Sequence, residues 1–397
     1  MIADQPIPAQ VAQQQATPRR ATPEQAMQRA LALAGSVLTA GPNPRVGCVI
    51  VRDGVVVGEG FHARAGDPHA EANALSQAGE LARGASVYVS LEPCSHTGRT
   101  PPCSEALVHA GVAEVIFAGA DPNPKVCGRG LTRMREAGIK VTGPTLPEQA
   151  DALNPGFIKR MKYGLPFVRC KMAMSLDGRT AMASGESKWI TGPVARADVQ
   201  RLRATSCAII TGINTVLSDN PSLNVRPEQL NDARAQHLAG RQPLRVILDS
   251  TLRTPTDAAI LRQPGKVLLL TGAAAENSQT YSGEHVRVQA LASGSDGRPD
   301  LRAALQSLAL DYECNDVLLE AGPTLSGAMV QAGLVDELII YIGAKLLGSD
   351  ALPLFKLAGL NRMQDQIELR ITGMEQMGDD IRLTARPIVT PFNKAKV

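Results

Sequence analysis

The apolar and polar positions of the first 145 residues alternate between helix spacing and strand spacing. Thr22-Pro23-Glu24-Gln25 offers an N-cap, a proline at the first helical position and a capping-box glutamine, and apolar residues follow at helical spacing from Met27 to Leu38. Residues 46–51 and 55–57 are apolar runs on either side of Arg52-Asp53-Gly54, which predicts a β-hairpin. The further expected elements are helices at residues 67–78, 102–110 and 131–137 and strands at 85–90, 112–118 and 139–141. This alternation predicts a three-layer α/β domain.

The second half of the chain shows the same alternation without an internal repeat. Strands are expected at residues 167–174, 207–211, 244–248, 266–270 and 317–320, with a final strand at 337–342, and helices at 193–204, 301–308 and 324–331. Residues 142–165 contain a Gly-Pro turn and scattered polar residues, so we expect them to connect two domains, and residues 272–299 resemble a polar loop. We therefore expect a disordered tail at residues 1–21, one α/β domain at 22–145 and a second at 165–375.

Composition narrows the classes of protein to which the chain can belong. A length of 397 residues favours two domains, and 44% hydrophobic with 20% charged residues is typical of a globular chain. Only 3% of the residues are aromatic and the net charge is +3, which argues against a nucleic-acid partner. The sequence contains no apolar run of transmembrane length, and its Gln- and Pro-rich first residues lack the pattern of a secretory signal. The number of cysteines is seven, which is odd. We expect a cytoplasmic protein that binds neither nucleic acid nor membrane.

Four residues form the candidate catalytic group. His69-Ala70-Glu71 opens a predicted helix, Cys94 follows a predicted strand, and Cys103 begins the next helix. One imidazole and two thiolates suit Zn²⁺, and three protein ligands leave the fourth tetrahedral position to water, as in catalytic zinc sites. Helix N-termini favour thiolates, and zinc lowers the pKa of its bound water towards about 7. Glu71 is expected outside the metal shell, as the general acid and base of a deaminase.

Several alternatives to this interpretation remain open. His96 lies between the cysteines and is a possible ligand, although a pocket or surface role is favoured. Eight residues separate Cys94 from Cys103, which departs from the usual Pro-Cys-x-x-Cys form and argues against a generic cytidine or tRNA-adenosine deaminase. The rival functions are a zinc deaminase that acts on a nucleic-acid base, fused to an unrelated reductase, and a structural zinc protein that binds nucleotides without turnover. The remaining cysteines, expected to be buried and unreactive, are Cys48, Cys127, Cys170, Cys207 and Cys314.

Several motifs together carry a resemblance to one family. Asn43-Pro44-x-Val46-Gly47, His69-Ala70-Glu71 and the segment Pro-Cys-Ser-His-Thr-Gly-Arg-Thr-Pro-Pro-Cys at residues 93–103 resemble the deaminase half of the bifunctional riboflavin-biosynthesis deaminase/reductases. The long insert between the two cysteines is the distinguishing part. Residues 171–179, 187–191, 212–226 and 320–325 resemble the reductase half. The resemblance covers roughly residues 22–347.

This resemblance implies two consecutive reactions on one pyrimidine. The first is hydrolytic deamination of 2,5-diamino-6-(5-phospho-ribosylamino)pyrimidin-4-one, and the second is NADPH-dependent reduction of the ribosyl group, which gives 5-amino-6-(5-phospho-ribitylamino)uracil. It implies a cytidine-deaminase-like domain followed by a dihydrofolate-reductase-like domain, with Zn²⁺ and NADPH as cofactors and a small pyrimidine ribotide as substrate. We also expect a homo-oligomer. The implied cofactor-binding set is Ala173, Trp189, Thr215, Asp219, Ser250, Gly322, Pro323, Thr324, Leu325, Ser326, Gly327 and Ala328, and the implied substrate-binding set is Ser187, Arg203, Leu223, Arg226 and Glu320.

The chemistry of the second half is compatible with this resemblance. No Gly-x-Gly-x-x-Gly follows a predicted strand, so a Rossmann dinucleotide site is not supported. Instead, the strand ending near Glu320 leads into small residues that open a helix, where free backbone N–H groups suit a phosphate. Arg203 and Arg226 offer forked donors to a sugar phosphate. Lys171 and Glu320 are hypothetical proton-handling groups, because the hydride itself comes from the cofactor.

Overall fold

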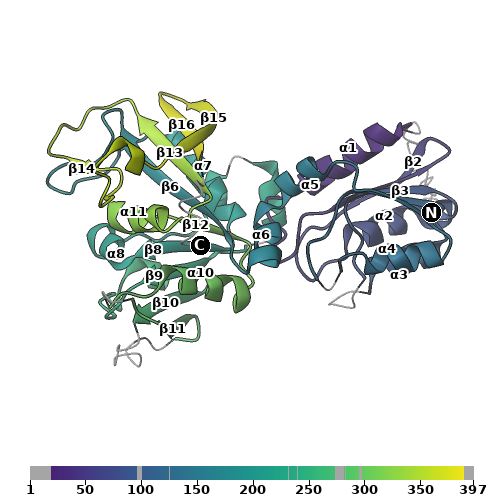
Figure 1. The fold of residues 1–397 in the computed structure, drawn as a ribbon, viewed down its shortest axis with the longest axis horizontal. Coiled ribbons are helices and arrows are strands. Elements are labelled where there is room, and N and C mark those ends of the chain that lie inside the picture. Colours follow the sequence, from purple (N-terminus) through teal and green to yellow (C-terminus); the bar gives the residue numbers. More distant parts are fainter. Residues whose placement is uncertain are drawn as a thin grey trace, which may run out of the picture.

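The structure is a computed structural model that describes residues 19–95, 101–124, 126–230, 232–238, 240–272, 281, 283–294 and 297–388. Two lobes, each built around one sheet, lie side by side and are joined near helix α6 (Figure 1). Most of the expected tail, residues 1–18, lies outside the described residues, and Arg20 forms an isolated bridge with Val55. Among the described residues, no helix combines the length and apolar character needed to cross a lipid bilayer.

The first lobe is the expected three-layer α/β domain. Its elements are α1 (Pro23–Ala34), β1 (Gly47–Arg52), β2 (Val55–Phe61), α2 (Ala70–Ala78), β3 (Ser86–Leu91), α3 (Cys103–Ala110), β4 (Glu114–Gly119), α4 (Arg129–Glu136) and β5 (Lys140–Thr142). The sheet has the order β2-β1-β3-β4-β5, and β3, β4 and β5 run parallel. The predicted hairpin is β1-β2, and the predicted capping box of Thr22 and Gln25 begins α1.

Two apolar clusters hold this sheet between its helices. On one face, buried side chains of α2, α3 and α4 pack against β1, β3 and β4. On the other, α1 packs against β1 and β3 together with Ala150 of α5 (Pro147–Leu153). Both layers of helices are visible in Figure 1. The positions that the sequence places on the apolar stripe of each helix are the buried ones, which is why the pattern predicted this domain.

The segment that connects the lobes is helical, which the sequence analysis did not predict. It forms α5 and then α6 (Pro155–Tyr163), each with a proline in its first turn. The helices are only seven and nine residues long, and Asn154 lies between them. Such short segments carry too few apolar positions for a helical period to be recognised.

The second lobe contains a larger, mainly parallel sheet. The strands of this lobe are β6 (Phe167–Ser175), β7 (Arg179–Ala181), β8 (Ala208–Gly212), β9 (Leu244–Leu248), β10 (Val267–Gly272), β11 (Val286–Leu291), β12 (Asp316–Leu319), β13 (Glu337–Gly343), β14 (Leu352–Pro353), β15 (Leu369–Met377) and β16 (Asp380–Pro387). Of these, β7 and β14 form a separate two-stranded sheet. The main helices are α7 (Pro193–Thr205), α8 (Ile213–Asp219), α9 (Ala259–Arg262), α10 (Leu301–Leu310) and α11 (Pro323–Gln331). The order of the nine-stranded sheet in the described residues is β11-β10-β9-β8-β12-β6-β13-β16-β15.

Helices cover both faces of this sheet, as the α/β prediction requires. Buried side chains of α10 and α11 pack on one face and those of α7, α8 and α9 on the other. Two expectations about its strands were wrong. Residues 286–291, expected to lie in a loop, form β11, and residues 337–342 are not the final strand, because β15 and β16 follow in antiparallel pairing. Both β11 and β15 are edge strands with many exposed side chains, so their sequences lack the apolar run of a central strand.

The two lobes meet at the amino ends of the parallel strands. The Pro42 carbonyl accepts hydrogen bonds from Asn315, which precedes β12, and from Arg160 of α6, both at 3.0 Å. A Cβ atom built on Gly41 would lie 2.9 Å from the Cys207 sulfur, just before β8, so a side chain at position 41 would require Cys207 to shift. The first lobe therefore contacts the second sheet at the amino ends of its parallel strands. The carboxyl ends of the same strands point away from the first lobe.

Candidate functional site

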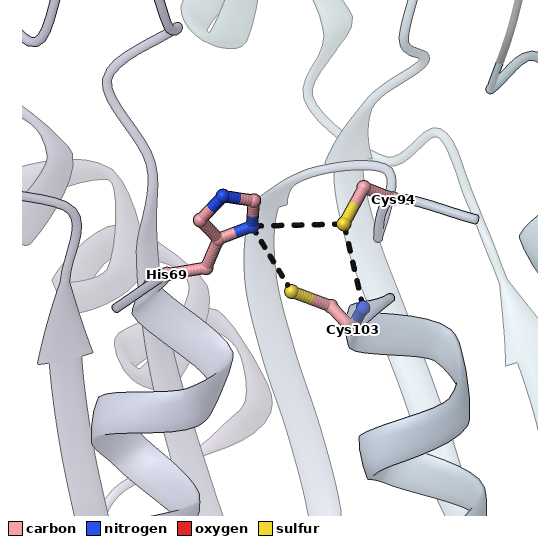
Figure 2. A group of neighbouring side chains, drawn as sticks. All are labelled: His69, Cys94 and Cys103. Atoms are coloured by element: carbon pink, nitrogen blue, oxygen red, sulfur yellow. Dashed lines mark hydrogen bonds between the residues drawn. The ribbon is translucent and has the colours of Figure 1, made fainter. Parts of the chain in front are cut away.

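His69, Cys94 and Cys103 converge on one point in the first lobe (Figure 2). Their candidate ligand atoms all lie within 4.8 Å of one another. The Nδ1 atom of His69 lies 3.2 Å from the Cys103 sulfur and 3.6 Å from the Cys94 sulfur. Tetrahedral zinc, with Zn–N bonds of about 2.0–2.1 Å and Zn–S bonds of about 2.3 Å, requires N···S separations of about 3.5 Å. The donor set and its spacing therefore fit this metal.

Local structure explains why the three side chains meet. His69 is the N-cap of α2, Cys94 follows the end of β3, and Cys103 is the first residue of α3. The backbone N–H of Cys103 donates to the Cys94 sulfur at 3.3 Å, and the N–H of Ser104 donates to the Cys94 carbonyl at 3.1 Å. The first N–H groups of a helix have no partner within the helix, so here they hold Cys94 beside the start of α3. His96, the alternative ligand, lies outside the described residues.

The site favours a thiolate at Cys94 even before any metal binds. A hydrogen bond from the Cys103 thiol lowers the pKa of Cys94 to about 4, and His69 acts in the same direction, while burial opposes both. The same hydrogen bond raises the pKa of Cys103, because Cys103 is the donor. Cysteine binds metal as the thiolate. In the metal-free site Cys94 is therefore already in the ligating form, whereas Cys103 must lose its proton when the metal binds.

Glu71 lies in the first turn of α2 and is only 3% exposed. Burial raises the pKa of its carboxyl group to about 7, and the charge of Cys94 adds to this. Glu71 does not belong to the group of three ligand atoms. A buried carboxyl group that titrates near neutral pH beside a metal site can both accept and return a proton.

The structure adds His62 to this site, a residue that the sequence analysis missed. Its ring lies edge-on to that of His69, with 5.1 Å between the ring centroids. Nδ1 of His62 lies 3.1 Å from the Pro68 carbonyl, which can only accept, so Nδ1 carries the proton and Nε2 accepts from the side-chain amide of Asn43 at 2.9 Å. Burial lowers the pKa of His62, in keeping with a neutral ring. Asn43 and the Asn-Pro motif are thus tied to the candidate metal site.

A second missed group lies on the other side of Cys94. Asp121 and Glu92 are both buried, and Glu92 accepts hydrogen bonds from the backbone N–H groups of Asp121 and Gly128 at 3.3 and 2.7 Å. Burial raises the pKa of Asp121 to about 7, and the charges of Glu92 and Cys94 act in the same direction. The signal was present in the sequence, because Asp121-Pro122-Asn123-Pro124 follows the buried strand β4 with only Ala120 between them. Polar residues at the carboxyl end of a parallel strand commonly face a ligand.

The free cysteines only partly match the expectation of buried thiols. Cys48, Cys170 and Cys314 are buried, and Cys207 is half-buried. Cys127 is exposed, so the expectation was wrong for it. It lies in a turn before α4, where the preceding Val126 is the buried residue.

In the second lobe, candidate residues gather at the carboxyl ends of β6, β8, β9 and β12. Gly322, the N-cap of α11, donates its backbone N–H to the Thr215 hydroxyl of α8 at 3.2 Å, which joins two turns that lie 107 residues apart in the chain. A Cβ atom on Gly322 would meet only the Thr215 hydroxyl, at 3.9 Å, among the described atoms within 4 Å. The backbone there is open to a ligand, and this edge of a parallel sheet is where cofactors bind in α/β folds.

Arg203 and Glu320 form a buried, two-pronged ion pair at the same edge. Their nitrogen–oxygen distances are 2.6 and 2.9 Å, and Arg203 also donates to the Asn224 carbonyl at 3.2 Å. Burial opposes ionisation of Glu320, but Arg203 and then Lys171 outweigh it, so its pKa is lowered. Burial lowers the pKa of Lys171, with Glu320 acting the other way. Of the two residues considered for proton handling, Lys171 is therefore the one poised to release a proton.

The remaining candidates take different positions in this lobe. Leu223 is buried and Arg226 is exposed, with its backbone N–H bonded to Gln200 at 3.1 Å. Trp189 is 64% exposed, and the Arg196 guanidinium lies 4.6 Å from the centre of its ring. Ser326 and Gly327 face the protein interior: a Cβ atom on Gly327 would lie 2.2 Å from the Lys356 carbonyl oxygen. Ala173, Ser187 and Ser250 are half-buried, while Asp219 is exposed at the end of α8.

Family models match both lobes. Residues 20–119 match the zinc-binding region of cytidine and deoxycytidylate deaminases, and residues 166–383 match the RibD C-terminal domain.

Relatives match nearly the whole chain. The chain is 50% identical to the riboflavin biosynthesis protein RibD of Escherichia coli K12 over 362 residues, which cover 90% of this chain and 97% of the relative. Its fold is similar to that of Acinetobacter baumannii RibD, with a TM-score of 0.84, 47% identity and coverage of 92% of this chain and 98% of that one. It is also similar to the deaminase/5-amino-6-(5-phosphoribosylamino)uracil reductase of Thermotoga maritima, with a TM-score of 0.79, 32% identity and the same coverage.

Proposed function

Because the chain belongs to the RibD family of bifunctional riboflavin-biosynthesis deaminase/reductases, we propose that each lobe carries one of the two reactions. The deaminase step belongs to residues 22–145 and the reductase step to the domain expected at 165–375, whose sheet continues to Pro387. The enzyme hydrolyses the 2-amino group of 2,5-diamino-6-(5-phospho-ribosylamino)pyrimidin-4-one and then reduces the ribosyl group with NADPH. The family gives no support to a nucleic-acid base as the substrate.

The convergence of His69, Cys94 and Cys103 carries the assignment of the first step. These three residues hold Zn²⁺, and when bound there the ion supplies a Lewis acid that lowers the pKa of a coordinated water towards about 7. The Glu71 carboxylate takes one proton from the attacking water and passes it to the pyrimidine ring nitrogen. It then transfers a second proton, from the hydroxyl group of the adduct, to the amine, which leaves as ammonia. Burial of Glu71 keeps its pKa near 7, so both transfers are accessible at neutral pH.

The open backbone around Gly322 carries the assignment of the second step. The helix start at residues 322–324 and Thr215 bind the phosphates of NADPH, together with the other members of the cofactor-binding set given above. When bound, NADPH supplies the hydride. Arg226, whose side chain is exposed, binds the sugar phosphate, and Arg203 orients the substrate while Glu320 holds its guanidinium. Lys171 supplies the proton that accompanies the hydride.

One assay of the purified full-length chain tests this division. Ammonia release and NADPH oxidation are followed after addition of the diaminopyrimidine ribotide, with and without a chelator. We expect the chelator to stop ammonia release while a previously deaminated substrate still oxidises NADPH. Ammonia release that persists after complete zinc removal, or that occurs only with tRNA, would refute the assignment.

The edge strand β15 supports a homo-oligomer. Its outer edge has no neighbour in the described sheet, and Leu369, Ile371 and Met374 are 42%, 64% and 72% exposed. Unpaired strand edges with apolar side chains attract another strand, and the occupant we propose is β15 of a second copy. Ile371→Lys should shift the mass in light scattering from oligomer to monomer, whereas Leu310→Lys, at an exposed site on α10, should not. A monomeric wild-type chain would contradict this proposal.

A further inference from the structure

A cavity of about 260 Å³ lies between the two lobes, and neither the zinc ligands nor the turns at Thr215 and Gly322 are among its lining residues. The first lobe and its connecting helices contribute the segment from Leu38 to Arg45 and residues of α5 and α6, and the second contributes residues of α7 and the amino-terminal parts of β6, β12 and β13. The candidate reductase site lies at the carboxyl ends of these strands. On β6, the lining residue Arg169 lies four residues before Ala173 of the proposed cofactor-binding set, about 13 Å at 3.3 Å per residue.

Arginine side chains dominate the charge of the cavity wall. The charged residues that line it are Arg45, Arg169, Arg201, Arg234, Arg382, Asp316 and Glu337, five basic and two acidic. Arg169 is neutralised within the wall, because it pairs with Asp316 at 2.8 Å and Glu337 at 3.1 Å. Arg201 and Arg234 pair with Asp198 and Asp232, which are not among the lining residues. Arg382 pairs with Glu375, also outside the lining, at 3.0 Å. Among the arginines of the wall, Arg45 therefore differs in having no ion pair within the described residues.

Arg45 is the residue whose charge is least compensated. Its backbone is fixed by two hydrogen bonds with the Asn154 side chain, at 2.8 and 2.9 Å, and its guanidinium donates to the Leu153 carbonyl. In the described part of the chain no carboxylate forms an ion pair with it. Burial lowers the pKa of Arg45, and the charges of Arg169 and Arg234 add to this, while Asp316 acts in the opposite direction. A half-buried cation repelled by two others is the arrangement that an anionic ligand stabilises.

A second arginine of the wall also has spare donor capacity. The Nε atom of Arg382 is buried and has no hydrogen-bond partner within the described residues, although it lies 3.3 Å from an Asp198 oxygen. Buried donors without a partner are uncommon in native proteins.

We propose that this interlobe cavity is a binding site for a small oxyanion, namely phosphate or the phosphate end of a monoester, held by Arg45 with Arg234 and Arg382. Guanidinium groups bind phosphate oxygens through paired, charge-assisted hydrogen bonds. The cavity falls below the roughly 300–1,000 Å³ of sites for drug-sized ligands, so a whole dinucleotide does not fit. The site differs from both the zinc site and the proposed NADPH site, and it does not depend on either assignment.

The cavity is linked to the deaminase site through one side chain. Asn43 lines the cavity and also donates to His62, whose ring contacts His69. An anion in the cavity is therefore expected to act on the KM of deamination through the segment 39–46, and to leave the reductase constants unchanged.

Calorimetric titration of the zinc-loaded full-length chain with inorganic phosphate tests the proposal, with chloride balancing the ionic strength. Three proteins are compared: wild type, Arg45→Gln, and Arg226→Gln, which removes the proposed phosphate contact of the reductase substrate. We expect Arg45→Gln to weaken phosphate binding by roughly ten-fold or more, since a hydrogen bond to a charged group is lost. Arg226→Gln should change the phosphate affinity of the interlobe cavity by less than a factor of two.

Two outcomes would overturn the proposal. Phosphate affinity that is unchanged in Arg45→Gln but lost in Arg226→Gln would place the only bound phosphate at the reductase site. Circular dichroism checks folding, and if Arg45→Gln is unfolded, Arg234→Gln replaces it, because that side chain is 39% exposed. Wild-type crystals soaked in selenate give an independent measurement: an anomalous peak beside Arg45 supports the site, and its absence at saturating selenate refutes it.

Discussion

In the first lobe, the candidate metal ligands come from a short stretch of chain, since His69 and Cys103 are 34 residues apart. In the second lobe, Arg203 and Glu320 are 117 residues apart, and Thr215 and Gly322 are 107 apart. The ligands of the first site lie at and near the starts of α2 and α3. The second site requires β8 and β12 to be neighbours in the sheet. A compact site thus depends on local structure, while a dispersed site depends on the whole sheet being assembled.

The variant with the largest expected effect tests whether the two sites work independently. Glu71→Ala should reduce the kcat of deamination by about 10²–10⁴-fold, because the proton-transfer group is lost. Bound zinc should remain near one equivalent, since Glu71 is not one of the three ligand residues. NADPH oxidation with a deaminated substrate should not change. The measurements are ammonia release, zinc content and NADPH absorbance on one preparation.

The matched control for this variant is Glu80→Ala, at an exposed position in the turn after α2. It should match the wild type in all three measurements. Deamination at the wild-type rate in Glu71→Ala would remove Glu71 from the mechanism. A parallel fall of reduction would show that the two sites are not independent.

The second prediction tests whether the dispersed site also stabilises its domain. Arg203→Met leaves the buried Glu320 carboxylate unpaired, which is expected to destabilise the second lobe by about 3–5 kcal/mol. Trp189 is the single tryptophan of the chain, so its fluorescence during urea unfolding reports on this lobe alone. Zinc release reports on the first lobe and should occur at an unchanged urea concentration. Arg262→Met, at an exposed position on α9, is the control and should shift neither transition.

The same contrast explains how much of the molecule the sequence could predict. The zinc ligands were predictable because each lies at a motif and a helix start. His62 was missed because it becomes a site residue only once β2 brings its ring beside that of His69, whereas the place of Asp121 after the buried strand β4 was a signal that went unused. In the second lobe the pairing of Arg203 with Glu320 leaves no trace in either local sequence. The edge strands β11 and β15 were missed because their exposed side chains break the apolar pattern by which the central strands were predicted.

The third prediction concerns the burial of Glu71 in the metal-free protein. Its folded pKa of about 7 lies above the ordinary value of 4.5, so the folded state binds more protons than the unfolded state between these pH values. Stability should therefore fall as pH rises from about 4.5 to 7, and Glu71→Gln should remove this loss. At pH 8 the variant should be more stable by up to about 3 kcal/mol, and at pH 4 the two proteins should be equal. Urea unfolding after chelation measures both, and an equal difference at the two pH values would contradict the assigned pKa.

The smallest expected effect tests whether the two turns of the dispersed site act together. Thr215→Ala removes the acceptor of the Gly322 N–H, which loosens the start of α11 against α8. The loss of one hydrogen bond is about 1 kcal/mol, so the KM for NADPH should rise roughly five-fold with little change in kcat. Thr215→Ser keeps the hydroxyl and should restore the wild-type KM, whereas a merely steric role of the methyl group would leave Ser as impaired as Ala. Ammonia release should be the same in all three proteins, because this contact lies at the strand ends that point away from the zinc site.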